Sequence, residues 1–159
     1  REQFLPITME EAWAFFSAPR NLARITPPDM GFVIREPFDE HEPYVGQRIT
    51  YTVKPLLGIP LTWVTLIGQV HAPSRFVDTQ LKGPYKRWWH LHTFEEVPGG
   101  VLMRDRVEYE LPMGFLGELA HGIFVKRRLE HIFAFRSTML EKLFGDHAKE
   151  TSEQPNKAA

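Results

Sequence analysis

Two different spacings of apolar residues divide the chain. From Phe32 to Leu111, β-branched and aromatic residues recur in short runs separated by glycine and proline, which is typical of strands. From Leu116 to Phe144, apolar residues recur at steps of three and four, which is typical of a helix. Such a helix would extend roughly 40 Å and needs a broad partner. The pattern therefore predicts a sheet crossed by one long C-terminal helix.

The strand region divides into six runs after a first short strand over Glu2–Leu5. The turns between the runs are too short for crossover helices, which indicates antiparallel pairing. The predicted runs are Phe32–Glu36, Gln47–Lys54, Leu61–His71, Phe76–Leu81, Arg87–Val97 and Val101–Leu111.

The segment after the first strand predicts two short helices. Thr8 and Glu11 have the spacing of a capping box, so a helix should begin there. Pro19 ends that helix and suits the first turn of a second one, which runs through Leu22 and Ile25. The predicted fold class is α+β, with a curved antiparallel seven-stranded sheet around the long helix and two short helices between strands 1 and 2.

Length and composition indicate one domain. A chain of 159 residues, 43% of them hydrophobic, has room for one core. Gly145 fits the end of the long helix, so we assign residues 1–145 to a single domain. Residues 146–159 are polar and contain proline, which indicates a disordered tail.

The Gly99-Gly100 pair predicts a tight hairpin that aligns the last two strands. Pairing outward from Pro98 and Val101 sets Phe94 opposite Asp105, His92 opposite Val107, His90 opposite Tyr109 and Trp88 opposite Leu111. The other face sets Glu95 against Arg104 and Thr93 against Arg106, and we assign that face to solvent. The inward face is large, aromatic and partly polar, as expected of a pocket wall rather than a solid core.

Alternation extends this wall to the neighbouring strands. Ile49, Tyr51 and Val53 should face inward. Trp63, Thr65 and Ile67 are assigned inward as well, although Val64 and Leu66 between them are also apolar. The facing of Phe76, Asp78 and Gln80 is undecided. Phe133 and Arg136 lie on the apolar stripe of the long helix. A cavity between the sheet and this helix is therefore expected.

Net charge and residue content exclude several classes of function. Nineteen basic and twenty acidic residues give a net charge of -1, which argues against nucleic-acid binding. Apolar runs are too short for a membrane span, and residues 1–6 hold no apolar signal core. The chain has no cysteine, which excludes disulfides and thiolate metal sites. We expect a cytoplasmic protein without membrane insertion and without a cofactor.

His90 and His92 lie on one strand face near Asp105, and several interpretations of this group stay open. Alternate residues of a strand lie about 7 Å apart, so the two rings should be well separated and no metal site is expected. The group can instead anchor a ligand, transfer protons, or form an internal hydrogen-bonded network. Arg136 can contact a ligand or pair with an acidic residue. Trp89 falls on the solvent face, where it marks a homodimer contact or lies under a loop.

Several motifs in the same order resemble the START-like (SRPBCC, helix-grip) superfamily, specifically its bacterial ligand-binding and cyclase-like group. They are Arg20-Asn21-Leu22 with Ile25-Thr26-Pro27-Pro28, Gly83-Pro84-Tyr85 before Trp88–Phe94, Asp105–Tyr109, and Arg128-Leu129 with Ile132-Phe133 and Arg136. The resemblance covers residues 1–145 and implies a helix-grip fold with a pocket. That superfamily contains carriers, sensors, cyclases and aromatases, so the fold does not choose among them.

The first functional hypothesis is a binder of a small hydrophobic, aromatic or polycyclic molecule, acting as a carrier, sensor or sequestering protein. Its expected ligand-binding residues are Tyr51, Trp63, Trp88, His90, His92, Phe94, Asp105, Val107, Tyr109, Phe133 and Arg136. The second is a polyketide cyclase/aromatase-like or hydrolase-like enzyme, with His90, His92, Asp105 and Tyr109 as catalytic residues. The third is a protein-interaction module whose pocket is filled by its own side chains. We favour the binder because the sequence supplies no nucleophile, metal cage or cofactor loop.

Overall fold

The computed structural model describes residues 1–35, 42–55, 58–112 and 114–145, and residues 114–123 by their backbone alone. The elements are β1 (Glu2–Leu5), α1 (Met9–Ser17), α2 (Pro19–Leu22), the 3-10 turns η1 (Ala23–Ile25) and η2 (Pro28–Met30), β2 (Val33–Ile34), β3 (Arg48–Val53), β4 (Leu61–His71), β5 (Arg75–Lys82), β6 (Arg87–Val97), β7 (Gly100–Glu110) and α3 (Gly114–Phe144). This is the α+β fold class predicted from the sequence. The predicted tail, residues 146–159, lies outside the described residues.

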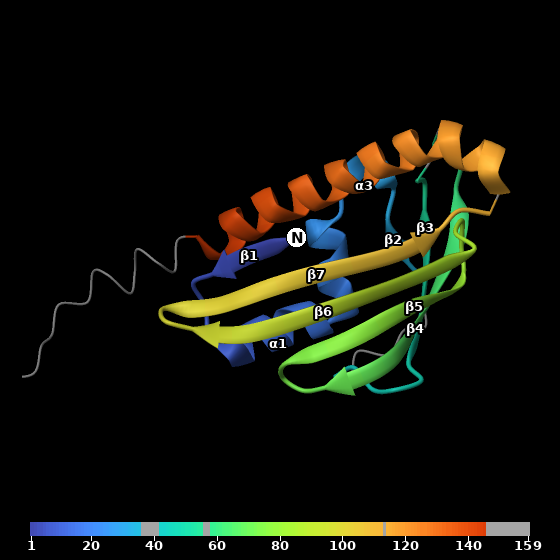
Figure 1. The fold of residues 1–159 in the computed structure, drawn as a ribbon. Coiled ribbons are helices and arrows are strands. Elements are labelled where there is room, and N and C mark those ends of the chain that lie inside the picture. The colour runs from blue at the N-terminus through green and yellow to red at the C-terminus, as the bar shows by residue number, and fades with distance from the viewer. Residues whose placement is uncertain (36–41, 56–57, 113, 146–159) are drawn as a thin grey trace, which may run out of the picture.

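The seven strands form one antiparallel sheet in the order β1-β7-β6-β5-β4-β3-β2. Figure 1 shows α3 running along the sheet, with α1 and the short turns on the way from β1 to β2. The predicted bounds of β4 and β6 match, whereas β2 is shorter than the predicted Phe32–Glu36. Glu36 itself lies outside the described residues.

Helix α1 begins where the capping box predicted. The Thr8 backbone N–H donates to Glu11 Oε2 at 2.8 Å, and the Glu11 N–H donates to Thr8 Oγ1 at 3.2 Å. Each bond satisfies an amide that the first helical turn leaves free. The helix directs Ala12, Trp13 and Phe15 into the core.

The β6–β7 hairpin has the predicted inward face but a different register. The pairs are Trp88 with Tyr109, His90 with Val107, His92 with Asp105 and Phe94 with Met103, so the predicted pairing was wrong by two residues. The two-residue turn is Pro98-Gly99, with Gly99 at φ 85°. Because side chains alternate with a period of two, this shift leaves both faces unchanged.

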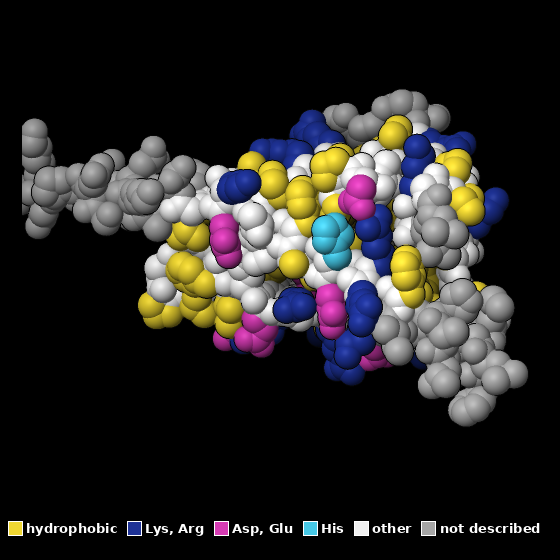
Figure 2. Space-filling model, turned by 90° about the horizontal axis from the view of Figure 1, so that it is seen from above, with side chains coloured by type: hydrophobic (Ala, Val, Ile, Leu, Met, Phe, Trp, Pro, Cys, Tyr) yellow, Lys and Arg dark blue, Asp and Glu magenta, His cyan; other side chains and the backbone are white. Residues whose placement is uncertain are grey.

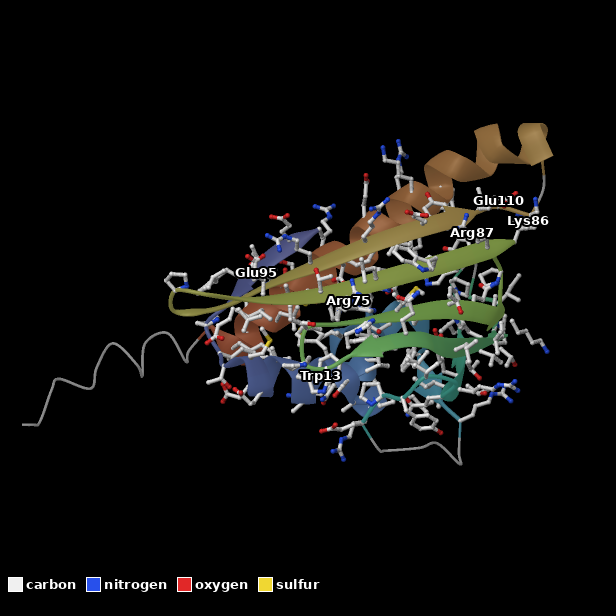
Figure 3. All side chains as sticks on the ribbon, turned by 60° about the horizontal axis from the view of Figure 1, so that its bottom comes forward. Trp13, Arg75, Lys86, Arg87, Glu95 and Glu110 are labelled. Carbon is white, nitrogen blue, oxygen red and sulfur yellow. The ribbon has the colours of Figure 1, made fainter. Side chains whose placement is uncertain are left out.

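The outward face of the hairpin carries ion pairs. The predicted Glu95–Arg104 pair forms with 2.5 Å between Arg104 Nη1 and Glu95 Oε2, although the two residues are diagonal rather than opposite. Figure 3 shows Lys86, Arg87 and Glu110 together at the other end of β6 and β7, where Lys86 pairs with Glu110. Trp89 is half-buried on this face.

Two irregularities bend the sheet between β4 and β5. The register shifts between Val64 and Thr65 and again between Ile67 and Gln69. An extra residue in one strand increases the local twist and bends the strand.

The main core joins α1, β6, β7 and the end of α3. Trp13 packs edge-on against Phe76 and Phe94, with ring centroids 5.9 and 6.2 Å apart. Leu140 of α3 is fully buried in the same cluster. A second, smaller cluster consists of Tyr51, Val53 and Trp63, with partly buried neighbours.

Polar contacts join α3 to η2 and to β1. The Arg128 guanidinium donates to Asp29 of η2 at 2.6 Å, and Gln3 of β1 donates to the Ser137 carbonyl at 3.0 Å. Figure 2 shows basic, acidic and hydrophobic side chains mixed on the face that carries α3. In the described part of the chain, no helix combines the length and the hydrophobicity that a membrane span needs.

Candidate functional site

A cavity of about 210 Å³ lies between the sheet, α3 and the helices that follow β1. Its sheet wall includes the inward residues of β3 and β4, as alternation predicted: Ile49, Tyr51, Val53, Trp63, Thr65 and Ile67. Phe16 and Leu22 line it from the N-terminal helices, and Leu129, Ile132 and Phe133 line it from α3. A curved sheet that packs large side chains against a helix leaves a cavity between them, and small ligands commonly bind in such cavities.

Aromatic rings dominate one part of this wall. Tyr51 and Trp63 are stacked with centroids 5.9 Å apart, and Trp63 meets Trp88 edge-on at 5.3 Å. The Tyr51 hydroxyl lies 3.0 Å from Thr65 Oγ1, so its polar end has a partner. Burial raises the pKa of the Tyr51 hydroxyl, which keeps that group neutral.

A polar cluster borders this aromatic part, because the His90 and Trp88 ring centroids lie 6.1 Å apart. His90 Nε2 lies 3.0 Å from Asp105 Oδ1, and His92 Nδ1 lies 2.8 Å from the same oxygen. His92 Nε2 lies 2.9 Å from Asp78 Oδ2, and His90 Nδ1 lies 3.4 Å from it. Each imidazole is therefore held between two carboxylates.

The two imidazoles lie closer together than strand spacing predicted. Their centroids are 3.8 Å apart, because the side chains of His90 and His92 turn toward each other. Phe76 stacks on His92 at 4.2 Å, and Phe133 meets His90 edge-on at 6.0 Å. Packing on both sides leaves the rings little freedom to separate.

Arg136 extends the cluster from α3. Its guanidinium Nη1 lies 3.6 Å from Asp105 Oδ2, and its Cζ lies over the Phe16 ring at 5.4 Å. The side chain is buried and lines the cavity, and its Nε has no hydrogen-bond partner. The apolar stripe of the helix thus carries a buried cation that pairs with an acidic residue, one of the two roles left open for Arg136.

The acidic groups of the cluster are ionised. Burial opposes ionisation of Asp105, but the charge of Arg136 and bonds from both histidines outweigh it and hold its pKa well below the ordinary range. For Asp78, burial is likewise outweighed by His90 and His92, so its pKa is lowered. Two carboxylates and one guanidinium therefore carry fixed charge beside the apolar space.

The imidazoles differ from each other. Burial and the neighbouring His92 lower the pKa of His90. For His92, burial is outweighed by hydrogen bonds to Asp105 and Asp78, so its pKa is raised. Since two adjacent charged rings repel, protonation of one ring opposes protonation of the other.

The structure divides the expected ligand-binding residues into two groups. Seven line the cavity: Tyr51, Trp63, Trp88, His90, His92, Phe133 and Arg136. Four do not line it: Phe94 belongs to the Trp13 core, Asp105 lies behind the imidazoles, Val107 pairs with His90, and Tyr109 packs on Tyr85 and Trp88. An inward strand position is necessary for contact with the cavity, but core packing takes up several such positions.

Two residues have a larger part in the cavity wall than sequence reasoning indicated. Asp78 was undecided, yet it pairs with His90 across β5 and β6 and lines the cavity. The pairing of these two strands could have predicted the facing of Asp78, because opposite residues of a ladder share a face. Sequence reasoning favoured Arg136 among the basic residues of the long helix, but Arg128 also lines the cavity and donates to Asp29. Gln80 holds the β5–β6 loop by donating from Nε2 to the Tyr85 carbonyl at 2.7 Å.

No family model matches this sequence, and no curated protein matches it either. Solved structures do match. They include a nucleoside-diphosphate sugar epimerase from Corynebacterium glutamicum (24% identity, TM-score 0.61, 89% of this chain and 28% of that chain). This chain therefore spans little more than a quarter of the epimerase, and the likeness is limited to that part.

Two further structures match over most of their length. Protein NE0264 from Nitrosomonas europaea has 11% identity, a TM-score of 0.64 and coverage of 97% of this chain and 95% of that chain. Ara h 8.0201 has 16% identity, a TM-score of 0.56 and coverage of 89% and 95%. At these identities the likeness shows the fold alone. The matches and the architecture are together consistent with a helix-grip fold, and they single out no specific family.

Proposed function

We propose that the protein binds a small, hydrophobic, ring-containing molecule in the cavity between the sheet and α3. The observation that carries this proposal is the cavity itself, about 210 Å³ of space lined largely by aromatic and aliphatic side chains. In other proteins an apolar cavity of about 150 Å³ holds a benzene molecule. A pocket filled by its own side chains would leave no such space.

The ligand should also carry a polar group. His90, His92 and Arg136 lie together in the wall, and a few placed polar groups in an apolar pocket fix a ligand's orientation. A molecule whose rings lie against Tyr51 and Trp63 would direct its polar group to this cluster. Such an amphipathic ligand fits the helix-grip, START-like resemblance in a carrier, sensor or sequestration role.

Native mass spectrometry of freshly purified protein tests this proposal. We expect a chain carrying one small molecule, which organic solvent releases. Ile49→Trp should fill the cavity and remove that mass, whereas Arg48→Trp, on the exposed neighbouring position of β3, should retain it. A bare chain that also binds no member of a panel of apolar ring compounds would contradict the proposal.

A second candidate is acid–base catalysis in the same cavity, as in cyclase-like or hydrolase-like enzymes. It is favoured by His90, which lines the cavity while its Nε2 lies 3.0 Å from Asp105 Oδ1. A carboxylate behind an imidazole orients that ring for proton transfer. Tyr109, which sequence reasoning added to this group, does not line the cavity.

The two candidates differ in the fate of the molecule. The extracted ligand, incubated with fresh protein, should be recovered unchanged if the protein is a binder. Catalysis would give a product, and His90→Ala would slow its formation by roughly 10² to 10⁴. A product formed equally fast by wild type and His90→Ala would exclude this catalytic role.

A further inference from the structure

Three donor atoms converge on one point in the polar wall of the cavity. They are Asp78 Oδ2, one nitrogen of His90 and one nitrogen of His92, and all lie within 4.8 Å of one another. Asp78 Oδ2 is 2.9 Å from His92 Nε2 and 3.4 Å from His90 Nδ1. Ligands of one tetrahedral zinc ion lie roughly 3.3 Å apart, given metal–ligand bonds of about 2.0 to 2.1 Å. The two distances from Asp78 Oδ2 are already close to that value.

Hydrogen bonds occupy one nitrogen of each imidazole: His90 Nε2 bonds Asp105 Oδ1, and His92 Nε2 bonds Asp78 Oδ2. Four nitrogen–oxygen contacts of 2.8 to 3.4 Å join the two imidazoles to the two carboxylates. A neutral imidazole has only one N–H, so four donated bonds would need two charged rings. With centroids 3.8 Å apart, two charged rings would repel strongly. Only two of the four contacts are hydrogen bonds, and the buried His92 Nδ1 has no hydrogen-bond partner.

A divalent metal ion removes this conflict. Placed between Asp78 Oδ2, His90 Nδ1 and His92 Nε2, it accepts both imidazole lone pairs and balances the carboxylate charge. The opposite nitrogens, His90 Nε2 and His92 Nδ1, then carry the protons and face Asp105 Oδ1 at 3.0 and 2.8 Å. A carboxylate behind a metal-bound imidazole orients the ring and strengthens the bond to the metal.

The remaining coordination positions face the cavity. Asp78, His90 and His92 all line it, whereas Asp105 lies behind the imidazoles. Three protein ligands with an open position are the arrangement of sites that bind water or another molecule, rather than of closed structural sites. With Arg136 opposite one of the two carboxylates, a bound divalent ion leaves a net positive site. That charge favours an oxygen anion as the additional ligand.

We propose that Asp78, His90 and His92 form a binding site for a divalent transition-metal ion in the cavity wall. Asp105 is a positioning residue for both imidazoles, and the open side takes water or a carboxylate or phenolate oxygen of the cavity's ligand. Two imidazoles and one carboxylate suit Zn²⁺, and Co²⁺ reports the same geometry by its colour.

Metal titration of tag-free, chelator-treated protein tests the proposal. Isothermal titration with Zn²⁺ should give equimolar binding, and Co²⁺ should give visible absorption bands typical of four or five ligands that Zn²⁺ then removes. Asp78→Asn and His92→Gln should each abolish these bands. Asp105→Asn should weaken Zn²⁺ binding by roughly 10- to 100-fold without changing the stoichiometry, since it acts through the ligands.

Surface histidines provide the control. His71→Gln and His131→Gln change exposed imidazoles outside the cluster, and both variants should bind Zn²⁺ as wild type does. Circular dichroism of each variant separates loss of a ligand from loss of the fold. The wild-type result is decisive by itself, because absence of equimolar binding to folded wild-type protein would overturn the proposal. Binding that survives both Asp78→Asn and His92→Gln would overturn it as well.

The metal proposal and the ligand proposal fail separately. An apolar ring compound without oxygen or nitrogen probes the cavity with no need for a metal. If that compound binds and Zn²⁺ does not, the metal site is excluded and the hydrophobic cavity remains. If Zn²⁺ binds and neither that compound nor a ring compound with a polar group binds, the metal site stands and the proposed function fails.

Discussion

Asp78 and Asp105 contact the same two histidines from opposite sides. Asp78 lines the cavity, whereas Asp105 lies between the imidazoles and Arg136 and is almost fully enclosed. A buried carboxylate with these partners adds little net stability compared with well-packed apolar residues. Its removal, however, leaves the partners unpaired. Asp105 therefore combines a structural role with its position behind the site.

Replacing Asp105 by alanine should destabilise the metal-free protein by about 3 to 5 kcal/mol, because Arg136 and the histidines lose a buried partner. Urea unfolding followed by circular dichroism measures this change. Glu95→Ala is the control, since Glu95 pairs with Arg104 at the surface, and it should leave the midpoint nearly unchanged. Equal midpoints for wild type and Asp105→Ala would show that the cluster does not contribute to stability.

Alternation along the strands predicted which residues face inward, including His90, His92 and Asp105. It could not predict that the two imidazoles approach to 3.8 Å, because backbone spacing fixes the Cα positions and not the side-chain rotamers. Asp78 stayed undecided for a different reason. Phe76 and Val77 are both apolar, so polarity alone did not show which face of β5 points inward.

At the scale of elements, the period of the apolar residues was the most informative signal. It located α3 within two residues of its observed start, and it located β4 and β6 at their observed bounds. The hairpin register was less predictable, because proline followed by two glycines permits more than one turn. With Pro98-Gly99 as the turn, glycine occupies the position of positive φ.

The buried end of α3 supplies a test of how the helix packs. Leu140 is fully buried in the main core, so Leu140→Ala should destabilise the protein by about 2 to 5 kcal/mol through lost transfer energy and the cavity left behind. Lys142 is exposed, and Lys142→Ala should stay within about 0.5 kcal/mol of wild type. Thermal unfolding compares the two, and similar shifts would mean that α3 packs through another face.

The close approach of β1 to the hairpin gives a second test at this scale. A Cβ at Gly100 would lie 2.2 Å from the Leu5 carbonyl oxygen, so Gly100→Ala forces the strands apart. We expect a loss of about 1 to 3 kcal/mol in the free energy of unfolding. Gly68→Ala is the matched control, because its Cβ would meet only the Val77 carbonyl at 4.0 Å. If both variants unfold at the same denaturant concentration, β1 does not lie where the structure has it.

At the scale of the whole molecule, the cavity lies between two apolar clusters. The larger cluster contains Trp13 and Leu140, and the smaller one contains Tyr51 and Trp63. Sequence pattern predicted a cavity because large aromatic and polar residues share the inward face. It could not predict the dimensions of the space, which depend on how α3 and the bent sheet fit together.

The four tryptophans of the chain divide between the cavity and its surroundings, which makes them internal reporters. Trp63 and Trp88 line the cavity, whereas Trp13 belongs to the main core and Trp89 lies on the outward face of β6. Fluorine-19 NMR of protein labelled with 5-fluorotryptophan therefore resolves where a ligand binds. On titration with an apolar ring compound, the Trp63 and Trp88 signals should shift together and saturate, while those of Trp13 and Trp89 stay in place. Shifts confined to Trp13 or Trp89, or no shift in any of the four signals, would contradict a ligand-binding cavity between the sheet and α3.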